Sequence, residues 1–343
     1  MRPVQVSVLG AGSWGTALAA LACARANTLI WARSPEVAAA ISHEHLNPRH
    51  LSDITLPPSL QATADFDQAM AHVQDDTPAD KLIILGVPVA GLADICQRIA
   101  GALPVTRHTP LHLLWTCKGI QPTTQHLPHQ IIQQILPDAS WLRIGVLSGP
   151  SFAHEVAQGL PVALTLASYQ PSTGHVTQSV FHGHQARIYT TNDVIGVEVG
   201  GALKNVIAIA CGIADGLHLG TNARAALITR GLAEMQRLGV ALGGQADTFS
   251  GLAGLGDLVL TATGGLSRNR QVGIAIGEGQ TLTHILAGGM TAEGVHCARA
   301  ALALGQQHQV DLPITAAVCK VLFDGLAPRQ AVADLLSRDP RPE

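Results

Sequence analysis

The sequence predicts an α/β domain built on a doubly wound, mostly parallel sheet, followed by an all-helical domain. Short apolar segments alternate with helical segments through the first half, and a G-x-G-x-x-G pattern follows the first apolar segment. After about Gly196 the strand signals fade and long helical patterns take over. Alternating strands and helices are typical of parallel β-α-β winding. We therefore expect two domains, at residues 1–195 and 196–343.

The first half begins with an apolar strand at Val4–Leu9, which leads into an Ala- and Leu-rich helix at Ser13–Ala26. A second strand at Thr28–Trp31 precedes a helix that starts at Pro35. Further apolar runs bounded by polar or turn residues predict strands at Lys81–Val87, Leu111–Thr116, Arg143–Leu147 and Val162–Ala167. The carboxyl ends of such parallel strands form the ligand crevice of the sheet.

The second half has apolar residues at helical rather than strand spacing. This spacing predicts helices at Glu198–Ala210, Arg224–Leu238, Arg268–Gly277 and Glu293–His308. An all-helical second domain follows from this pattern.

Charge and composition exclude several classes of function. The chain has 343 residues and a formal net charge of −3, so it carries no global basic field of the kind that binds nucleic acid. Aromatic residues make up only 3%, which argues against a stacking platform for bases. The six cysteines are scattered without a C-x-x-C pair, so we expect no disulfide framework and a reducing, cytoplasmic location.

The N-terminal apolar run, Val4 to Ala24, has the outline of a secretory signal peptide. Three glycines and several polar side chains interrupt the run, so we expect a strand and a helix of the fold instead. Glu198 and Lys204 interrupt the longest other apolar candidate, and we therefore expect no membrane span.

The G-x-G-x-x-G pattern is formed by Gly10, Gly12 and Gly15, with Ser13 and Trp14 between them. These glycines allow a tight turn, close approach of the backbone to a pyrophosphate, and close packing of helix on strand. A glycine-rich turn without a ligand is the alternative. The pattern follows a strand and opens a helix, which is the context of the dinucleotide-binding Rossmann fold.

Arg33 follows the second strand, where an acidic residue would select NAD by binding the ribose 2′-hydroxyl. An arginine suits a 2′-phosphate instead, although an arginine in a turn is often simply solvated. We therefore expect NADP(H) as the cofactor, with NAD(H) also accepted.

Lys204 lies among small and apolar residues near the start of a predicted helix. Desolvation and a second nearby cation lower the pKa of a lysine, which can then exchange a proton with a substrate oxygen while a hydride moves to or from nicotinamide. Lys118, just past a strand end, is the expected second cation and an anion binder. Taken singly, each lysine is more typical of a surface side chain whose ammonium group reaches solvent, and the order of the motifs changes that interpretation.

Residues 251–270 combine a glycine-rich turn with Asp257 and the cluster Ser267, Arg268 and Asn269. An Arg-Asn pair at the start of a helix offers charge, directed donors and backbone N–H groups to a phosphate. This segment therefore predicts a pocket for an anionic substrate.

Three histidine pairs have metal-ligand spacing: His43 with His45, His126 with His129, and His182 with His184. None has an acid or a cysteine nearby at ligand spacing, so we expect solvated histidines and no metal. His154 is expected either to face the cleft or to make a structural hydrogen bond.

The chain resembles the bacterial NAD(P)-dependent sn-glycerol-3-phosphate dehydrogenase family nearly end to end. The resemblance is carried by the ordered motifs GAGSWG, CKGI, SGPSFAHEV, GGALKNVIAIACGIADGL and GLAGLGDLVLTATGGLSRNR. It implies a helical domain of the 6-phosphogluconate-dehydrogenase-like type and a homodimer. It also implies reversible reduction of dihydroxyacetone phosphate to sn-glycerol 3-phosphate, the backbone of glycerophospholipids.

The same resemblance assigns roles to individual residues. Lys204 is the proton donor and acceptor at the substrate oxygen. The implied substrate-binding residues are Lys118, Gly149, Ser151, Lys204, Asn205, Asp257, Ser267, Arg268 and Asn269. The implied cofactor-binding residues are Gly10, Gly12, Ser13, Trp14, Gly15, Arg33, Lys118, Ala153, Arg268, Thr291 and Glu293.

Two other functions remain compatible with the fingerprint. Another NADP-dependent reductase, acting on a hydroxyacid or ketopantoate, would keep the fingerprint and a lysine without the phosphate-binding cluster. A dinucleotide-sensing protein without catalysis would keep the first domain and lose the reactive side chains. Lys118, Lys204, Asp257 and Arg268 are all present, which argues against the sensor.

Overall fold

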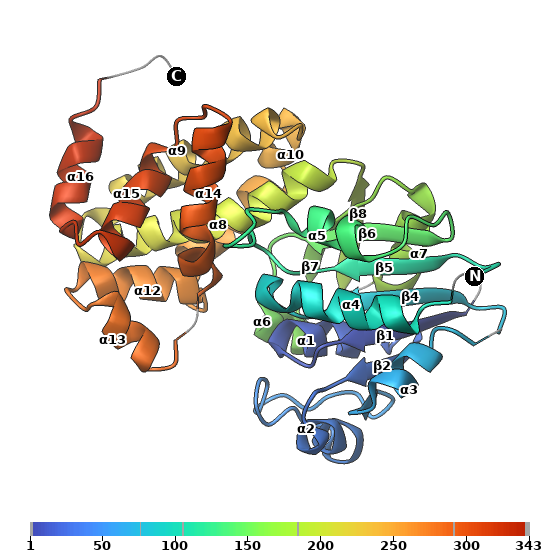
Figure 1. Cartoon of the computed structure of the whole chain (residues 1–343). Helices are drawn as coiled ribbons and strands as arrows, with labels where there is room; N and C mark the ends of the chain where they lie inside the picture. The colour runs from blue at the N-terminus through green and yellow to red at the C-terminus, as the bar shows by residue number, and fades with distance from the viewer. Residues whose placement is uncertain (1–2, 76, 105, 184, 291, 340–343) are drawn as a thin grey trace. The chain divides into compact units, whose positions relative to one another are not determined.

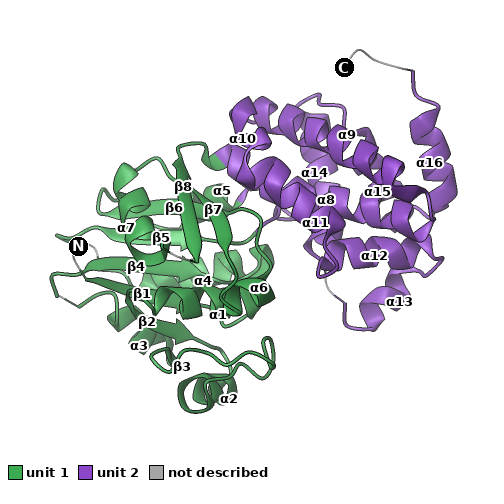
Figure 2. Cartoon of the chain, turned by 180° about the vertical axis from the view of Figure 1, so that it is seen from behind, with its two compact units in different colours: residues 1–117, 128–194 green, residues 118–127, 195–343 purple. Residues whose placement is uncertain are grey.

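A computed structural model describes residues 3–75, 77–104, 106–183, 185–290 and 292–339 of the chain. The chain forms two compact units, shown in different colours in Figure 2. Unit 1 contains residues 1–117 and 128–194, and unit 2 contains residues 118–127 and 195–343. The short segment 118–127 therefore packs with the helices of the second half. The domain boundary expected from the sequence, after residue 195, places this segment in the first domain instead.

Unit 1 is built on an eight-stranded sheet with the order β3-β2-β1-β4-β5-β6-β7-β8. Neighbouring strands are parallel except at the antiparallel pair β6 and β7 (Figure 1). The strands are β1 (Val4–Leu9), β2 (Asn27–Trp31), β3 (Gln61–Thr63), β4 (Asp80–Leu85), β5 (Leu111–Trp115), β6 (Leu142–Ser148), β7 (Val162–Ala167) and β8 (Ala186–Thr191). The central strands are buried almost throughout, as expected for a sheet covered on both faces.

Helices pack in two groups against this sheet. One group contains α1 (Ser13–Ala22), α6 (Ala153–Ala157) and α7 (Pro171–Phe181). The other contains α3 (Phe66–Ala71), α4 (Leu92–Ala102) and α5 (Pro128–Ile135), and α2 (Pro35–Ala39) follows β2. The predicted doubly wound α/β architecture is confirmed.

Two strands and one helix end differ from the sequence-based expectation. Strands β3 and β8 were not predicted, and β8 pairs in parallel with β7 at the edge of the sheet. The first helix ends at Ala22 rather than Ala26, because residues 23–26 form the turn that leads into β2. The N-terminal apolar run forms strand β1 and helix α1 of unit 1, as expected for a strand and a helix of the fold.

Unit 2 is helical. It contains α8 (Val194–Gly216), α9 (Gly220–Ala241), α10 (Ala246–Ser250), the π-helical turn η3 (Leu252–Gly256), α11 (Asp257–Thr263), α12 (Arg268–Gly277), α13 (Leu282–Ala287), α14 (Glu293–Gln307), α15 (Pro313–Phe323) and α16 (Pro328–Leu336). Helix α8 is long and apolar enough to cross a membrane by length and composition, but 94% of its most apolar window is buried inside the protein. It is the core helix of this unit.

Glycines bring two segments unusually close to α8. A Cβ atom on Gly212 would clash with the carbonyl oxygen of Arg270 in α12, and a Cβ on Gly273 would clash with the carbonyl oxygen of Ile209. A Cβ on Gly200 would lie 2.6 Å from the carbonyl oxygen of Ala253 in η3. Helix α8 therefore holds the starts of both α11 and α12 at close range.

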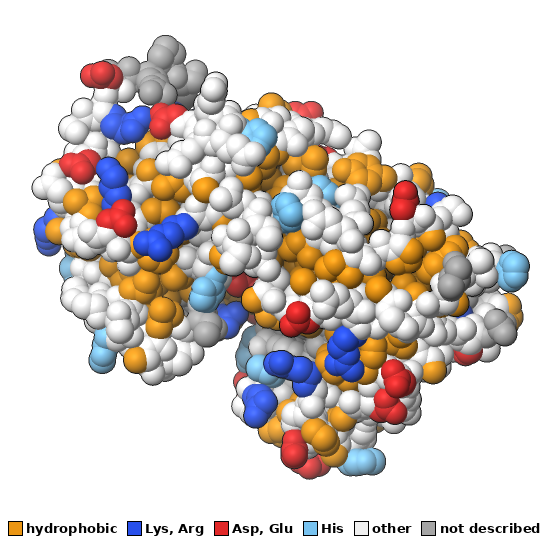
Figure 3. Space-filling view, viewed as in Figure 1, with side chains coloured by type: hydrophobic (Ala, Val, Ile, Leu, Met, Phe, Trp, Pro, Cys, Tyr) orange, Lys and Arg blue, Asp and Glu red, His pale blue; other side chains and the backbone are white. Residues whose placement is uncertain are grey.

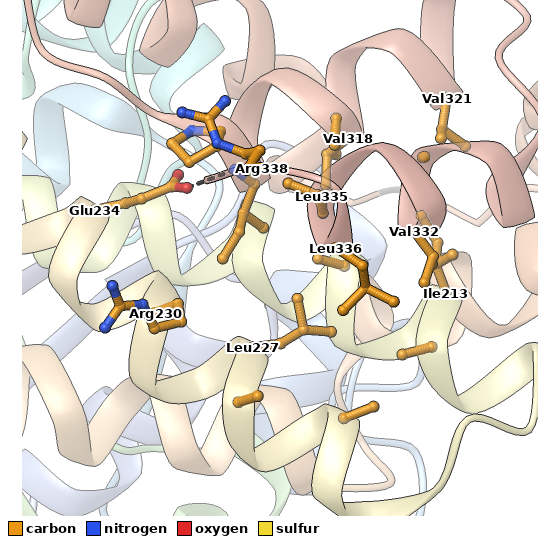
Figure 4. Close-up of a pocket in the computed structure, with 18 of the residues that line it drawn as sticks. Ile213, Leu227, Arg230, Glu234, Val318, Val321, Val332, Leu335, Leu336 and Arg338 are labelled. Atoms are coloured by element: carbon orange, nitrogen blue, oxygen red, sulfur yellow. Dashed lines mark hydrogen bonds between the residues drawn. The ribbon is translucent and has the colours of Figure 1, made fainter. Parts of the chain in front are cut away.

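A cavity of about 730 Å³ lies between α8, α9, α15 and α16 in unit 2. Figure 4 shows its apolar lining, with the carboxylate of Glu234 accepting hydrogen bonds at the start of α15. None of the polar residues predicted to act on the substrate lines this cavity.

On the face shown in Figure 3, positive and negative side chains are interspersed rather than gathered by sign.

Candidate active site

The glycine-rich turn in unit 1 connects β1 to α1. Gly10 has a φ of +118°, a conformation that glycine adopts readily, and a Cβ there would lie 2.8 Å from the carbonyl oxygen of Gly86. A Cβ on Gly15 would clash with the carbonyl oxygen of Gly10. The protein's own packing thus explains why these two positions are glycine.

Gly12 differs from its two neighbours in the pattern. Its φ is −72°, which any residue can adopt, and a Cβ would come no closer than 3.9 Å to another group of the protein. Gly12 also directly precedes α1, where the helix dipole and unpaired N–H groups favour an anion. Its missing side chain leaves room for a ligand, and this cradle fits the pyrophosphate of a dinucleotide.

The loop after α2 is tied to this turn by Asn47. Its side-chain amide donates to the carbonyl oxygen of Ala11 at 3.0 Å and to Thr16 Oγ1 at 2.8 Å, and its Oδ1 accepts from the N–H groups of Arg49 and His50. Buried Asn47 therefore fixes the loop beside the fingerprint.

His154 makes a structural contact. Its Nε2 lies 2.7 Å from Asp53 Oδ2, which joins α6 to the loop after Asn47. The hydrogen bond from His154 is the main reason why the pKa of the Asp53 carboxyl is lowered. One of the two expectations for His154, a structural hydrogen bond, is therefore met.

The other predicted residues of unit 1 lie at the ends of strands and helices. Arg33 is exposed, two positions after β2. Gly149 has a φ of +128° directly after β6, and Ser151 Oγ donates to the Gly149 carbonyl oxygen at 3.1 Å. Ala153 is the first residue of α6, and the indole Nε1 of Trp14 is buried without a hydrogen-bond partner in the described part of the chain.

In unit 2, Lys204 of α8 meets the first residue of α11. Its Nζ donates to Asp257 Oδ1 at 2.5 Å and to Thr261 Oγ1 at 2.9 Å. The Thr261 hydroxyl in turn donates to the Asp257 carbonyl oxygen at 2.6 Å. Lys204, Asp257 and Thr261 are all buried, so the ammonium group is held in one orientation.

Lys118 approaches the same carboxylate from the other side. Its Nζ lies 2.6 Å from Asp257 Oδ2, and its side chain keeps 14% of its surface exposed. One carboxylate therefore joins two ammonium groups from segments 86 positions apart in sequence, Lys118 and Lys204.

Burial and this neighbourhood shift the pKa values of three groups. The pKa of Lys204 is lowered to about 8: burial is the main cause, the charge of Asp257 opposes it, and Lys118 adds to the lowering. Burial alone would raise the pKa of Asp257, but Lys118 and Lys204 together outweigh it and hold that pKa below its ordinary value. Burial raises the pKa of Glu293, with partial opposition from Lys204 and Arg268. A lysine with a pKa near neutrality can both donate and accept a proton.

Hydrogen bonds link Asn205, Asn269 and Gly294, each of which directly follows a residue with a predicted role. Asn269 Nδ2 donates to Asn205 Oδ1 at 2.9 Å, and the Gly294 N–H donates to Asn269 Oδ1 at 2.9 Å. A Cβ on Gly294 would lie 2.6 Å from the Asn205 carbonyl oxygen. Helices α8, α12 and α14 are thereby joined one position after Lys204, Arg268 and Glu293.

The cluster predicted to bind phosphate, Ser267, Arg268 and Asn269, is divided between exposed and structural positions. Ser267 is the N-cap of α12, with its Oγ accepting from the Arg270 N–H, and Asn269 is buried in the hydrogen-bond chain. Arg268, the first residue of α12, is exposed. Thr291 lies outside the described residues.

Two residues of the site, Thr261 and Gly294, were not predicted from the sequence. Thr261 stands four positions after Asp257, which places both on one face of a helix, so the helical period could have identified it. Gly294 is recognisable only from the close packing of three helices.

Among the described residues, no three His, Cys, Asp or Glu side chains are grouped so that they could hold a metal ion. His184, of one predicted histidine pair, lies outside these residues.

The chain matches two models of one protein family. Residues 5–174 match the N-terminal model of NAD-dependent glycerol-3-phosphate dehydrogenase, and residues 193–333 match the C-terminal model. Glycerol-3-phosphate dehydrogenase [NAD(P)+] of Burkholderia cenocepacia is 56% identical over 99% of this chain and 100% of its own length.

Solved structures agree with these matches. The glycerol-3-phosphate dehydrogenase of Coxiella burnetii has a TM-score of 0.87 and 38% identity, covering 98% of this chain and 99% of its own. The Saccharomyces cerevisiae enzyme has a TM-score of 0.83 and 26% identity, covering 98% of this chain and 100% of its own. The chain therefore belongs to the NAD-dependent glycerol-3-phosphate dehydrogenase family.

Proposed function

We propose that this chain catalyses the reversible reduction of dihydroxyacetone phosphate to sn-glycerol 3-phosphate, with NADPH or NADH as the reductant. Family membership supports the reaction, as does the name of the Burkholderia cenocepacia relative. The single observation that carries the chemistry is the buried contact of Lys204 with Asp257, which Lys118 shares. A dinucleotide sensor would not need a lysine whose pKa is lowered to about 8.

Lys204 is the proposed acid and base. In the direction of reduction its ammonium group donates a proton to the substrate carbonyl oxygen, and in the reverse direction its neutral amine accepts the hydroxyl proton. The bound reduced nicotinamide supplies the hydride. Asp257 and Thr261 hold Lys204 Nζ in place, and Asp257 keeps the protonated form available by opposing the effect of burial.

Lys118 is the proposed electrostatic partner of the substrate. It is less buried than Lys204, with 14% of its side chain exposed. A second ammonium group next to the reacting carbonyl stabilises negative charge that develops on its oxygen. By family resemblance Lys118 also contacts the cofactor.

Arg268 is the proposed main contact of the substrate phosphate. It is exposed at the start of the ten-residue helix α12, where guanidinium charge and the helix dipole act in the same direction. The remaining proposed substrate-binding residues are Gly149, Ser151, Asn205, Asp257, Ser267 and Asn269.

The proposed cofactor site is centred on the fingerprint turn of unit 1. The pyrophosphate lies against Gly12, where the missing side chain leaves space for it. Arg33 binds the 2′-phosphate of NADP(H). Further proposed cofactor contacts are Gly10, Ser13, Trp14, Gly15, Lys118, Ala153, Arg268, Thr291 and Glu293. We also propose a dinucleotide-binding domain over residues 1–195 and a substrate domain over residues 196–343.

The proposed product is the backbone of glycerophospholipids, so the enzyme would supply lipid synthesis. We propose a cytoplasmic homodimer, on the resemblance to the family and on cysteine usage suited to a reducing compartment.

The test is oxidation of NADPH, followed by its absorbance, with dihydroxyacetone phosphate, unphosphorylated dihydroxyacetone and ketopantoate as parallel substrates. The proposal expects rapid turnover with the phosphorylated substrate and sn-glycerol 3-phosphate as the product. Preferential turnover of ketopantoate would identify the other reductase, and absence of turnover in folded protein that binds NADPH would identify a sensor.

A further inference from the structure

We infer that Asp215 is a positioning residue that fixes Arg268 relative to Lys204 and thereby makes the enzyme selective for a phosphorylated substrate. This inference rests on the proposed function, because it assigns a role in recognising the substrate of that reaction. Asp215 does not act on the substrate itself: it acts through Arg270, its partner in α12.

Asp215 lies in the last turn of α8 and binds two arginines. Its Oδ2 lies 2.8 Å from Arg270 of α12, and its Oδ1 accepts from Arg224 of α9 at 2.9 Å. The Asp215 side chain keeps only 13% of its surface exposed, against 17% for Arg270 and 25% for Arg224. Solvent therefore screens these pairs less than it screens ion pairs on an open surface.

The first turn of α12 is held by contacts of Ser267, Asn269 and Arg270. The Arg270 N–H is bonded to the capping Ser267, and the Arg270 guanidinium is bonded to Asp215. The Asn269 amide is bonded to Asn205 of α8. The exposed Arg268 side chain therefore projects from a turn whose backbone is fixed.

Both anchors of this turn belong to the helix that carries Lys204. Asn205 is the next residue, and Asp215 follows Lys204 by eleven positions, about three turns of helix. The close approach of Gly212 and Gly273 leaves no room for a side chain between α8 and α12. Asp215 thus helps to set the distance between the proton donor and the phosphate-binding arginine.

Loss of the Asp215 charge would have a specific effect on this turn. Arg270 and Arg224 would then face each other without the shared carboxylate, and their repulsion would push the start of α12 away from its present place. Lys204, Asp257 and Lys118 do not contact Asp215 through any hydrogen bond or ion pair in the described part of the chain. Catalysis on the carbonyl group should therefore survive better than recognition of the phosphate.

The experiment compares full-length wild type with D215N and with the conservative variants D215E and R270K. The matched control is D311N, since Asp311 also pairs with an arginine of the same unit, Arg338, at 2.6 Å. For each protein, kcat/KM is measured with dihydroxyacetone phosphate and with unphosphorylated dihydroxyacetone, together with Tm.

We expect D215N to lower the ratio of the two kcat/KM values about tenfold or more, mainly through a higher KM for the phosphorylated substrate. R270K should lower the same ratio, D215E should restore part of it, and D311N should leave it unchanged. An equal loss on both substrates, or a fall in Tm without a change in the ratio, would overturn the inference. Failure of wild type to reduce dihydroxyacetone phosphate would instead overturn the proposed function.

Discussion

Lys204 Nζ and Asp257 Oδ1 lie 2.5 Å apart in the buried interior of unit 2, although 53 positions separate the two residues in sequence. The pair sets two properties of the lysine at once. The carboxylate orients the ammonium group, and its charge opposes the fall in pKa that burial causes.

Removal of the Asp257 charge should move the pH dependence of the reaction. Reduction needs protonated Lys204, so wild-type kcat/KM for reduction should decline as pH rises through about 8. Asp257 raises the pKa of Lys204, so the decline in D257N should occur at lower pH, with kcat at neutral pH reduced about tenfold or more. The measurement is the pH profile of NADPH oxidation. An unchanged profile in folded D257N would show that Asp257 does not tune Lys204.

Replacement of Gly12 by alanine should impair cofactor binding without impairing the fold. A Cβ at Gly12 meets nothing closer than 3.9 Å in the protein, so only a bound pyrophosphate should be displaced, and Kd for NADPH should rise about tenfold or more. G15A is the contrasting variant, because its Cβ clashes with the Gly10 carbonyl oxygen and should cost about 1–3 kcal/mol of stability. Fluorescence titration and thermal unfolding measure the two effects. Normal NADPH affinity in G12A would argue against the proposed cradle.

Replacement of Arg33 by glutamine should alter the choice between cofactors. Loss of a charge-assisted contact to the 2′-phosphate should cost about 2 kcal/mol, or roughly thirtyfold in kcat/KM with NADPH. Activity with NADH should change little, because NADH lacks that phosphate. Parallel assays with both cofactors give the ratio, and an equal change with both would remove Arg33 from the 2′-phosphate site.

Replacement of Arg268 by alanine should raise KM for dihydroxyacetone phosphate, with a loss of about 2–3 kcal/mol in kcat/KM. Unphosphorylated dihydroxyacetone should be affected far less, since it offers no phosphate to bind. R299A is a suitable control because Arg299 is a largely exposed arginine of the same unit, paired only at 3.9 Å with Asp324 among the ion pairs described. A normal KM in R268A would contradict the assigned contact.

Much of the fold could be predicted because its signals are local. The first strand, the glycine turn and the helix after it follow one another within 22 residues, and the long apolar helix α8 has a clear helical period. Strand β8 was missed because only one of its faces is buried: Ala186 and Ile188 point inward, whereas Arg187 and Tyr189 are exposed. Such an edge strand lacks the continuous apolar run of a central parallel strand.

The site was predictable in its residue types but not in its contacts. Lys118, Lys204 and Asp257 could be identified from the sequence. The contact between their side chains depends on the packing of segment 118–127 with the rest of unit 2. It also depends on Gly200 of α8, whose missing side chain allows η3, the turn that directly precedes Asp257 in sequence, to pack closely against α8. Long-range packing of this kind leaves no periodic signal in the sequence.

The role of Lys204 is tested by the rate of dihydroxyacetone phosphate reduction by NADPH in K204A beside wild type, with NADPH affinity measured on the same samples. We predict that kcat falls by about two orders of magnitude or more while the Kd for NADPH stays within a few-fold of wild type. Wild-type turnover in folded K204A would show that Lys204 is not the proton donor.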